Sequence, residues 1–323
     1  MISKFVFNTQ DLKVKGEYKD QITKNIRITN VSTNMNPKNN CLIFVNKWSN
    51  ADENNLRNII NSLILLSENV RIINDKIKEN NQIIYVDNPR KHYASILHYI
   101  LEKNKKAKKY TQLENNITIG ENVIIGQNTI VEPFVLIDHD VTIGDNCIIK
   151  SGVKIRKCTQ IKNNTIIREN SVIGGDGFGV ERDLDRSTIR IPHIGGVIIG
   201  NNVDIGALNT VVSGTIEPTI IEDFVMTDDH IHIGHNCKVG KSTFITACVE
   251  VSGSVVIGEN CWIGPNSSII QKVTLGKNSI VGIGTVITKS FGDNEILAGS
   301  PADNIENFKR LRKVSKKLVK DFF

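Results

Sequence analysis

The sequence predicts a mainly β protein built on a parallel β-helix, and three observations lead to this prediction. An aliphatic residue occupies every sixth position from 119 to 173 without interruption. The same spacing returns over 199–211 and, after a shift of register, over 221–287, where Thr227 is the single polar occupant. Several of these aliphatic residues are followed by Gly-x-Asn, which suits a tight turn because Gly and Asn tolerate positive φ.

A period of six matches neither an α-helix nor an ordinary strand. It is typical of coils of short strands, each of which sends one aliphatic side chain into a continuous internal stack. We therefore expect a left-handed hexapeptide-repeat β-helix, a triangular prism with three hexads per coil, over 111–292. The flanking segments are expected to form an N-terminal α/β domain (1–110) and a C-terminal helical tail (293–323).

The N-terminal segment is long enough for a domain with its own core. The apolar runs 41–45 and 82–86 predict buried strands, and the second is ended by Asn88-Pro89. Apolar residues at helical spacing predict helices over 56–66 and 93–101.

Charge and cysteine usage narrow the class of protein. The net charge is +6, and its excess lies in two lysine-rich runs, 103–109 and 309–320. We interpret these runs as a solvated linker and a helix face, and we expect no nucleic-acid partner. The six cysteines show neither Cys-x-x-Cys nor a disulfide spacing, and no membrane span or signal peptide is evident. We expect a cytoplasmic protein.

The hexads are interrupted twice, and insertions into a solenoid form external loops that often carry function. The longer interruption, 174–197, begins Gly-Gly-Asp-Gly-Phe-Gly. Glycines around one acid and one aromatic let the backbone approach a ligand closely, so we expect Asp176, Gly177 and Phe178 to contact it. The shorter interruption, Glu217-Pro218, shifts the register by four residues.

The densest group of ionisable residues lies at 228–236 and reads Asp-Asp-His-Ile-His-Ile-Gly-His-Asn. Two isoleucines alternate with His230 and His232, so we expect these histidines to share one face of a strand. His235 falls on the next turn, where it can face a neighbouring prism. Histidines beside paired acids favour a functional site over a structural one.

These parts occur in an order that resembles the UDP-3-O-acylglucosamine N-acyltransferase (LpxD) family over nearly the whole chain. The matching motifs are Gly-x-Asp-Gly-Phe-Gly at 174–179, Ile-Pro-x-x-Gly at 191–195, Ile-Gly-Ala-x-Asn at 205–209, His-Ile-Gly-His-Asn at 232–236, Val-Asn-Lys-Trp at 45–48 and Asn-Pro-x-x-x-Tyr-Ala at 88–94. Each motif alone is weak evidence for the family, whereas the order of all of them along the chain is specific for it.

The resemblance implies an N-acyltransferase that moves an acyl group from a thioester, acyl-CoA or acyl carrier protein, to the amine of a nucleotide-linked amino sugar. The product would serve a bacterial surface polysaccharide or a lipid A-type glycolipid. The resemblance also implies a homotrimer, with the donor in grooves between adjacent prisms. We expect no metal ion and no cofactor besides the co-substrate donor.

By the same resemblance, His235 is the general base. An imidazole with a pKa of about 6.5 can accept the amine proton at neutral pH. Asp229 or Asp228 is expected to orient the ring, and the backbone N–H of Gly253 to polarise the thioester carbonyl. The other candidate substrate-binding residues of the prism are His232 and Asn236.

In the N-terminal domain the resemblance places the nucleotide base on Asn46, with Trp48 or Tyr93 stacking against it. Two departures from the family suggest a relative with a different acceptor sugar. The family's second active-site histidine is absent, and Lys272 lies nearest to its place. The sequence Ala-Gly-Ser-Pro-Ala at 298–302 is common in coenzyme A-dependent sugar acetyltransferases of the same fold.

Two other functions remain possible at this stage. A γ-class carbonic anhydrase has the same fold and binds Zn²⁺ through histidines spaced like His193, His230 and His235. It would leave the N-terminal domain and the 174–197 loop unexplained. A non-catalytic β-helix scaffold would leave the histidine cluster unexplained.

The sequence of the tail predicts an amphipathic helix that caps the open end of the prism. The same helix is a candidate docking surface for an acidic carrier protein or for the phosphates of the donor. The residues expected to face inward are Ile305, Phe308, Leu311 and Leu318. The residues expected to face outward are Lys309, Arg310, Arg312, Lys313, Lys316, Lys317 and Lys320.

Overall fold

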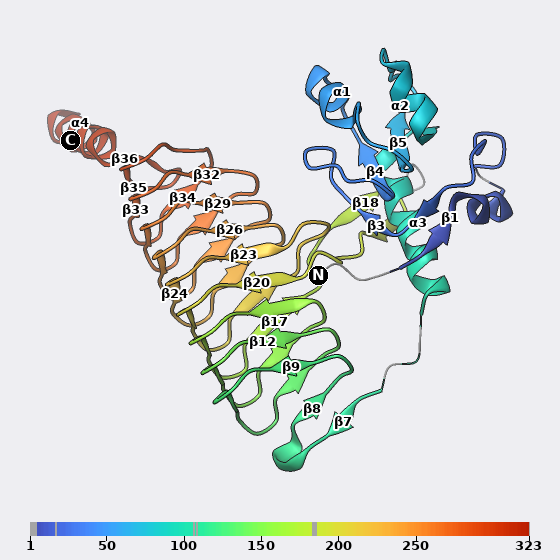
Figure 1. The fold of residues 1–323 in the computed structure, drawn as a ribbon. Helices are drawn as coiled ribbons and strands as arrows, with labels where there is room; N and C mark the ends of the chain where they lie inside the picture. Colours follow the sequence, from blue (N-terminus) through green and yellow to red (C-terminus); the bar gives the residue numbers. More distant parts are fainter. Residues whose placement is uncertain (1–4, 17, 106, 108, 183–185, 323) are drawn as a thin grey trace.

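A computed structural model of the chain describes residues 5–16, 18–105, 107, 109–182 and 186–322. It contains an N-terminal α/β domain, a long β-helical prism and a C-terminal helix that projects from the far end of the prism (Figure 1). Lys106 and Lys108 of the basic linker lie outside the described residues. No helix in the described ranges is long and apolar enough to cross a membrane.

The N-terminal domain is built on a parallel sheet in the order β3-β4-β5-β6. Its elements are β1 (Phe7–Asn8), the 3-10 helix η1 (Thr9–Lys15), β2 (Arg27–Ile28), β3 (Asn30–Val31), β4 (Cys41–Val45), α1 (Asn50–Leu56), β5 (Leu63–Ser67), α2 (Asp75–Asn80), β6 (Gln82–Val86) and α3 (Pro89–Lys103). The two predicted strands are confirmed as β4 and β6, and the helix predicted over 93–101 lies within α3.

The helix predicted over 56–66 is wrong. The helix α1 ends at Leu56, and residues 63–66 belong to the central strand β5, where all four side chains are fully buried. A parallel strand covered on both faces is apolar at every position, so part of it also satisfies helical spacing.

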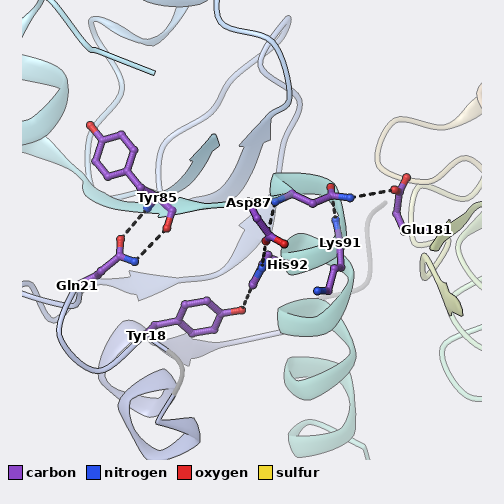
Figure 2. Close-up of polar contacts among 8 residues, drawn as sticks. Tyr18, Gln21, Tyr85, Asp87, Lys91, His92 and Glu181 are labelled. Carbon is purple, nitrogen blue, oxygen red and sulfur yellow. Dashed lines mark hydrogen bonds and ion pairs between the residues drawn. The ribbon is translucent and has the colours of Figure 1, made fainter. Parts of the chain in front are cut away.

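The start of α3 is fixed by side chains on both sides. Asn88 caps the helix by accepting the Lys91 N–H at 3.1 Å, and proline occupies its first turn. His92 then lies between two partners, with 2.7 Å from Nδ1 to the Tyr18 hydroxyl and 2.7 Å from Nε2 to Asp87 (Figure 2). This chain of hydrogen bonds ties α3 to the β1 region and to the end of β6.

The prism has three faces of stacked, mainly parallel strands. The first face contains β10 (Ile130–Val131), β13 (Ile148–Ile149), β16 (Ile166–Ile167), β21 (Asp204–Ile205), β24 (Met226–Thr227), β27 (Phe244–Ile245), β30 (Trp262–Ile263), β33 (Ile280–Val281), β35 (Ile296–Ala298) and β36 (Asp303–Asn304).

The second face contains β7 (Thr111–Gln112), β8 (Thr118–Ile119), β11 (Leu136–Ile137), β14 (Lys154–Ile155), β17 (Val172–Gly175), β22 (Thr210–Val212), β25 (His232–Ile233), β28 (Glu250–Val251), β31 (Ser268–Ile269) and β34 (Val286–Ile287). The third face contains β9 (Ile124–Ile125), β12 (Thr142–Ile143), β15 (Thr159–Ile161), β20 (Val197–Ile199), β23 (Thr219–Ile221), β26 (Lys238–Val239), β29 (Val256–Ile257) and β32 (Thr274–Leu275). A short 3-10 helix, η2 (Glu114–Asn116), precedes β8.

The repeating aliphatic residues fill the interior of the prism, which confirms the predicted left-handed β-helix. Ile137, Ile155 and Ile173 stack in register along the second face, and all three are fully buried. The turns between faces repeat a left-handed residue, such as Asn146 at φ 55°. Hydrogen bonds join these turns from coil to coil, as from Asn128 Nδ2 to Asn146 Oδ1 at 3.2 Å.

The insertion after β17 joins the prism to the N-terminal domain. It forms a hairpin of β18 (Val180–Arg182) and β19 (Thr188–Arg190), and both strands contact α3. Glu181 pairs with Arg90 and accepts a hydrogen bond from Asn88 at 3.4 Å. Farther along, Ile191 and Ile194 belong to the hydrophobic core of the N-terminal domain.

The last helix, α4 (Ile305–Phe322), does not cover the prism as predicted. Only Ile305 and Phe308 of the expected inward face are half-buried, while Leu311 and Leu318 are 62% and 51% exposed. The helix contacts β35 and β36 near its start and then extends away from them (Figure 1). The side chain of Lys320 lies outside the described residues.

The internal stack provides a direct test of the fold. Ile221 is fully buried in the stack, whereas its neighbour Ile220 points outward and is half-buried. We expect Ile221→Ala to lower the free energy of unfolding by about 2 to 5 kcal/mol, because it leaves a cavity that the rigid coils cannot close. The matched control Ile220→Ala should lower it by less than about 1 kcal/mol. Urea unfolding of both variants measures the difference, and equal losses would contradict the assigned register.

Candidate active site on the histidine edge

The candidate site lies on the edge where the second and third faces meet, here called the histidine edge. Its turns include 138–140, 213–218, 234–236, 252–254 and 270–272. His235 is the middle residue of the turn that follows β25, and Asn236 adopts φ 60° there. The register of the coils places this turn between Thr215 on one side and Gly253 on the other.

Asn236 fixes the protonation pattern of His235. Its Oδ1 accepts the Thr215 N–H at 3.2 Å, and its Nδ2 donates to the Glu217 carbonyl at 3.1 Å. A backbone N–H only donates and a carbonyl only accepts, so the orientation of the amide is determined. His235 Nδ1 lies 2.9 Å from the same Oδ1 and must therefore carry a proton. Nε2 of the neutral ring is left with its lone pair, as a general base requires.

Gly253 lies directly against this Nε2 atom. A Cβ atom at position 253 would lie 2.6 Å from it, so only glycine leaves the ring in place. In the described part of the chain the Gly253 N–H has no hydrogen-bond acceptor, while the flanking Ser254 N–H donates to the His235 carbonyl at 2.7 Å. The proposed role of Gly253 as an oxyanion donor stays a prediction.

A second histidine, His193, reaches the same site from the insertion. The two imidazole rings lie 5.4 Å apart between centroids, edge to face. Nδ1 of His193 donates to the Ile191 carbonyl at 2.9 Å, and Nε2 is buried without a hydrogen-bond partner among the described residues. Burial, followed by the proximity of His235, lowers the pKa of His193 to about 4, so its ring is neutral at physiological pH.

The glycine-rich start of the insertion covers His193. A Cβ atom on Gly177 would lie 2.7 Å from the His193 Nε2, and Arg190 holds the segment by donating to the Gly177 carbonyl at 2.8 Å. Phe178 is 81% exposed, with the Arg190 guanidinium 5.5 Å from its ring centre. Asp176 is also exposed. The predicted ligand contacts of these loop residues stay predictions.

The loop lies beside the candidate base of its own chain. It reaches His235 through His193, whose ring is packed against both. The insertion leaves and re-enters the prism at the histidine edge, between β17 and β20, within two coils of β25. One chain therefore supplies both parts.

The acidic pair does not orient His235, contrary to the prediction. Asp229 accepts the Ala207 N–H at 2.7 Å, and Asp228 accepts the Asp229 N–H at 2.9 Å. These residues lie in the turn before β25, which is a different edge of the prism from the turn that carries His235. Asn236, predicted as a substrate contact, occupies the orienting position instead.

The expectation for His230 and His232 is also corrected. His230 lies on the turn with φ 60°, outside the strand, and is exposed. His232 belongs to β25 and is half-buried, with its Nδ1 2.6 Å from the Thr210 hydroxyl. The two side chains therefore do not extend from one strand face. Lys272 is exposed on the coil beyond Gly253, whose carbonyl accepts the Lys272 N–H at 3.1 Å.

Of the predicted nucleotide-binding residues, Asn46 and Trp48 are accessible to a ligand and Tyr93 is not. Asn46 is exposed and Trp48 half-buried, just after the carboxyl end of β4. The Trp48 indole donates to Glu53 at 3.1 Å. The stacking role predicted for Tyr93 is wrong, because its ring is fully buried against Phe44, with 4.8 Å between ring centres.

The Tyr-Ala motif of α3 thus contributes to the core, since residues on the sheet-facing side of that helix are covered by β4 and β5. His193 was the residue that sequence reasoning undervalued. Its only signal was its place in the return segment of the insertion, and the hexad period says nothing about where that segment goes.

The described residues contain no group of three or more His, Cys, Asp or Glu side chains placed to hold a metal ion. Of the histidines considered for zinc, His230 lies on a different edge from His235, and the Nδ1 of His193 is already bonded to a carbonyl. The carbonic anhydrase alternative is not favoured.

Comparison with known proteins first defines the class. Residues 123–157, 140–175 and 254–289 match the family model described as bacterial transferase hexapeptide (six repeats). Among solved structures, the fold is similar to the UDP-N-acetylglucosamine acyltransferase from Campylobacter jejuni, with a TM-score of 0.53 and 24% identity over 58% of this chain and 71% of that one. The Francisella novicida enzyme of the same name is similar with a TM-score of 0.51 and 23% sequence identity, over 59% of this chain and 72% of that one. These structures support the fold alone.

The particular resemblance is to the UDP-3-O-acylglucosamine N-acyltransferases. The chain is 48% identical to the Dechloromonas aromatica protein of that name over 84 residues, which are 26% of this chain and 24% of the relative. It is 44% identical to the Methylobacillus flagellatus protein over 118 residues, 36% and 33% of the two chains. The similarity noted in the sequence is therefore confirmed, although the matches span only about a quarter to a third of the relatives.

The neutral state of His193 predicts a pH dependence of stability. Its pKa falls from 6.5 to about 4 on folding, so its contribution is fully present above pH 6.5 and is lost as the pH falls toward 4. Over this window the unfolded chain binds a proton that the folded chain does not, which lowers stability by roughly 3 kcal/mol. Urea unfolding of wild type and His193→Leu between pH 4 and 7 should show a weaker pH dependence in the variant. Identical slopes would contradict the assignment.

Proposed function

We propose that the protein is an N-acyltransferase that moves an acyl group from a thioester to the amine of a nucleotide-linked amino sugar. The observation that carries the proposal is the histidine edge itself. There Asn236 holds His235 as the tautomer whose Nε2 keeps its lone pair, and beside it lies the Gly253 N–H, for which the described ranges contain no acceptor. The relatives named as UDP-3-O-acylglucosamine N-acyltransferases support the same chemistry.

The reaction uses each group once. The amine nitrogen attacks the thioester carbon while His235 Nε2 takes one amine proton, and the imidazolium is stabilised by the Nδ1–H···Oδ1 bond to Asn236. The Gly253 N–H stabilises the charge that develops on the carbonyl oxygen. The C–S bond then breaks, and the proton passes from His235 to the departing thiolate. The products are an amide and a free thiol.

The acceptor would extend from the N-terminal domain to the histidine edge. Asn46 and Trp48 follow β4 at the carboxyl end of a parallel sheet, the end at which such sheets bind ligands. Asn88 follows β6 at the same end and bonds to Glu181 of the insertion. The insertion continues to His193, so nucleotide and sugar can be held by parts that are already in contact.

For the donor we propose acyl-CoA or acyl carrier protein, with α4 as the docking surface for its phosphates or acidic side chains. The apolar residues Leu311, Val314 and Leu318 form one exposed stripe. Cationic residues flank the stripe on both sides, with Arg310 and Lys317 on one side and Arg312 and Lys316 on the other. Packing such helices against copies of themselves would bring like charges together, so an anionic partner is favoured.

We further propose a homotrimer in the cytoplasm. Outward side chains on the first face form an apolar ladder, which includes Met226, Phe244, Trp262, Ile280 and Ile296, each more than a third exposed. A cavity of about 510 Å³ lies beside it. A continuous exposed ladder of this kind marks an interface. A closed ring of three gives every chain the same interface.

His235 provides the main test of the mechanism. We expect His235→Ala to lower kcat by about 10² to 10⁴ with little change in Tm, because the turn backbone remains bonded to its neighbouring coils. The matched control is His230→Ala, an exposed turn histidine on another edge, which should keep full activity. Turnover of UDP-3-O-acylglucosamine with acyl-CoA and acyl carrier protein donors is measured by mass spectrometry. A fully active His235→Ala enzyme would remove this residue from the mechanism.

The nucleotide site is tested separately. Trp48→Ala and Asn46→Ala should weaken binding of the nucleotide sugar in calorimetry by about 1 to 3 kcal/mol for the stacking residue, and leave donor binding intact. Tyr93→Phe is the matched control, because the buried hydroxyl of Tyr93 has no hydrogen-bond partner in the described part of the chain and its ring is covered. Equal loss of both ligands in the Trp48 and Asn46 variants would argue against a local role.

A further inference from the structure

His193 has an atom that the proposed mechanism does not use. The residue is 2% exposed, and none of the residues that the structure describes gives its buried Nε2 a hydrogen-bond partner. Since Nδ1 donates to the Ile191 carbonyl, Nε2 of the neutral ring is an acceptor and carries no proton. An unsatisfied buried acceptor lowers the stability of the folded state, so its presence calls for a donor that arrives with a ligand.

The surroundings of this acceptor point to the reaction site. Its ring lies edge to face with His235, 5.4 Å between centroids. Nε2 is covered by the backbone of Gly177, where a side chain would come within 2.7 Å. The next residue, Phe178, is exposed, so the segment 177–179 that packs against the acceptor lies at the surface. Glycines at both ends of this segment allow it to shift without side-chain clashes.

We propose that His193 determines the choice of acceptor atom, with its Nε2 accepting a hydrogen bond from the reacting amine once the 177–179 segment moves aside. This inference rests on the proposed acyl transfer. A primary amine carries two protons and one lone pair. One proton goes to His235 as the N–C bond forms and the C–S bond breaks, and then moves to the thiolate. The other stays on nitrogen, bonded to His193, and remains in the amide product.

The same arrangement disfavours a hydroxyl acceptor. A hydroxyl has one proton, which His235 must take, so nothing is left to donate to the buried His193 Nε2. Sites built to pair with a substrate N–H discriminate strongly against analogues that lack it, because their own polar groups are left unpaired. Two adjacent imidazoles, one that takes a proton from the acceptor and one that only accepts a hydrogen bond, thus select an amine.

A merely structural role for His193 makes different predictions, and two variants separate the roles. His193→Leu removes the acceptor but fills the space. His193→Gln offers an Oε1 near the position of Nε2. The matched control is His139→Asn on the same edge. His139 is also buried, but its Nδ1 accepts the Glu121 N–H at 2.8 Å, so its Nε2 is a donor and lies 3.7 Å from Asp138 Oδ1. An asparagine can replace the bond to Glu121, as Asn163 accepts the Asp145 N–H in a turn on another edge.

The experiment compares kcat/KM for UDP-3-O-acylglucosamine and for its 2-hydroxyl counterpart, UDP-3-O-acylglucose. We expect His193→Leu to keep or raise the Tm, to lower amine acylation by about 10- to 100-fold, and to leave hydroxyl acylation unchanged. His193→Gln should recover part of the preference for the amine over the hydroxyl acceptor, and His139→Asn should retain the full preference of the wild type.

An unchanged amine preference in a folded His193→Leu enzyme overturns the inference, as does an equal loss in the Leu and Gln variants. If the Leu variant fails to fold, the Gln variant decides, since loss of its preference would also overturn the inference. If the wild-type protein acylates neither acceptor with any donor, the proposed function is refuted. If it acylates the amine but His193→Leu keeps the same preference, only the inference about His193 is refuted.

Discussion

The in-register stacking of coils is the constraint on which the rest of the structure depends. Each coil repeats after eighteen residues where no insertion intervenes, so that Ile233 lies beside Val251. Backbone hydrogen bonds and a continuous aliphatic interior hold this register, because a slip would turn buried side chains outward. The pairing of the strands determines which turn residues lie next to each other. His235 therefore lies over Gly253 because the strands that precede them are paired, and no specific interaction between the two residues is needed.

This rigidity explains how a site can form on an exposed edge. A loop on a small globular domain would need packing on several sides to fix an imidazole. Here the backbone of one coil supplies the donor and acceptor that orient Asn236, and Asn236 orients His235. Catalytic groups gain most when their geometry is set before the substrate arrives.

Features that depend on the six-residue repeat could be predicted from the sequence, whereas features of the segments that interrupt the repeat could not. The prism, its aliphatic stack and the position of His235 on a turn follow from six-residue spacing alone. The orienting role of Asn236 does not, because its partners Thr215 and Glu217 lie in the segment that shifts the register. His193 could not be placed beside His235 for a related reason, since an insertion can return along many paths. Tyr93 was misjudged because a motif records which residues recur and says nothing of which face they occupy.

The insertion also has a consequence for how the molecule opens. Solenoid coils contact only their neighbours, so local unfolding starts at the ends and proceeds inward. The hairpin β18–β19 fastens a middle coil to α3 through Glu181 and Arg90, and Ile191 and Ile194 anchor it in the core of the N-terminal domain. Fraying of the first coils would therefore stop at this attachment. The coils that carry the histidines lie just beyond it, in the part of the prism where we expect amide hydrogens to exchange most slowly.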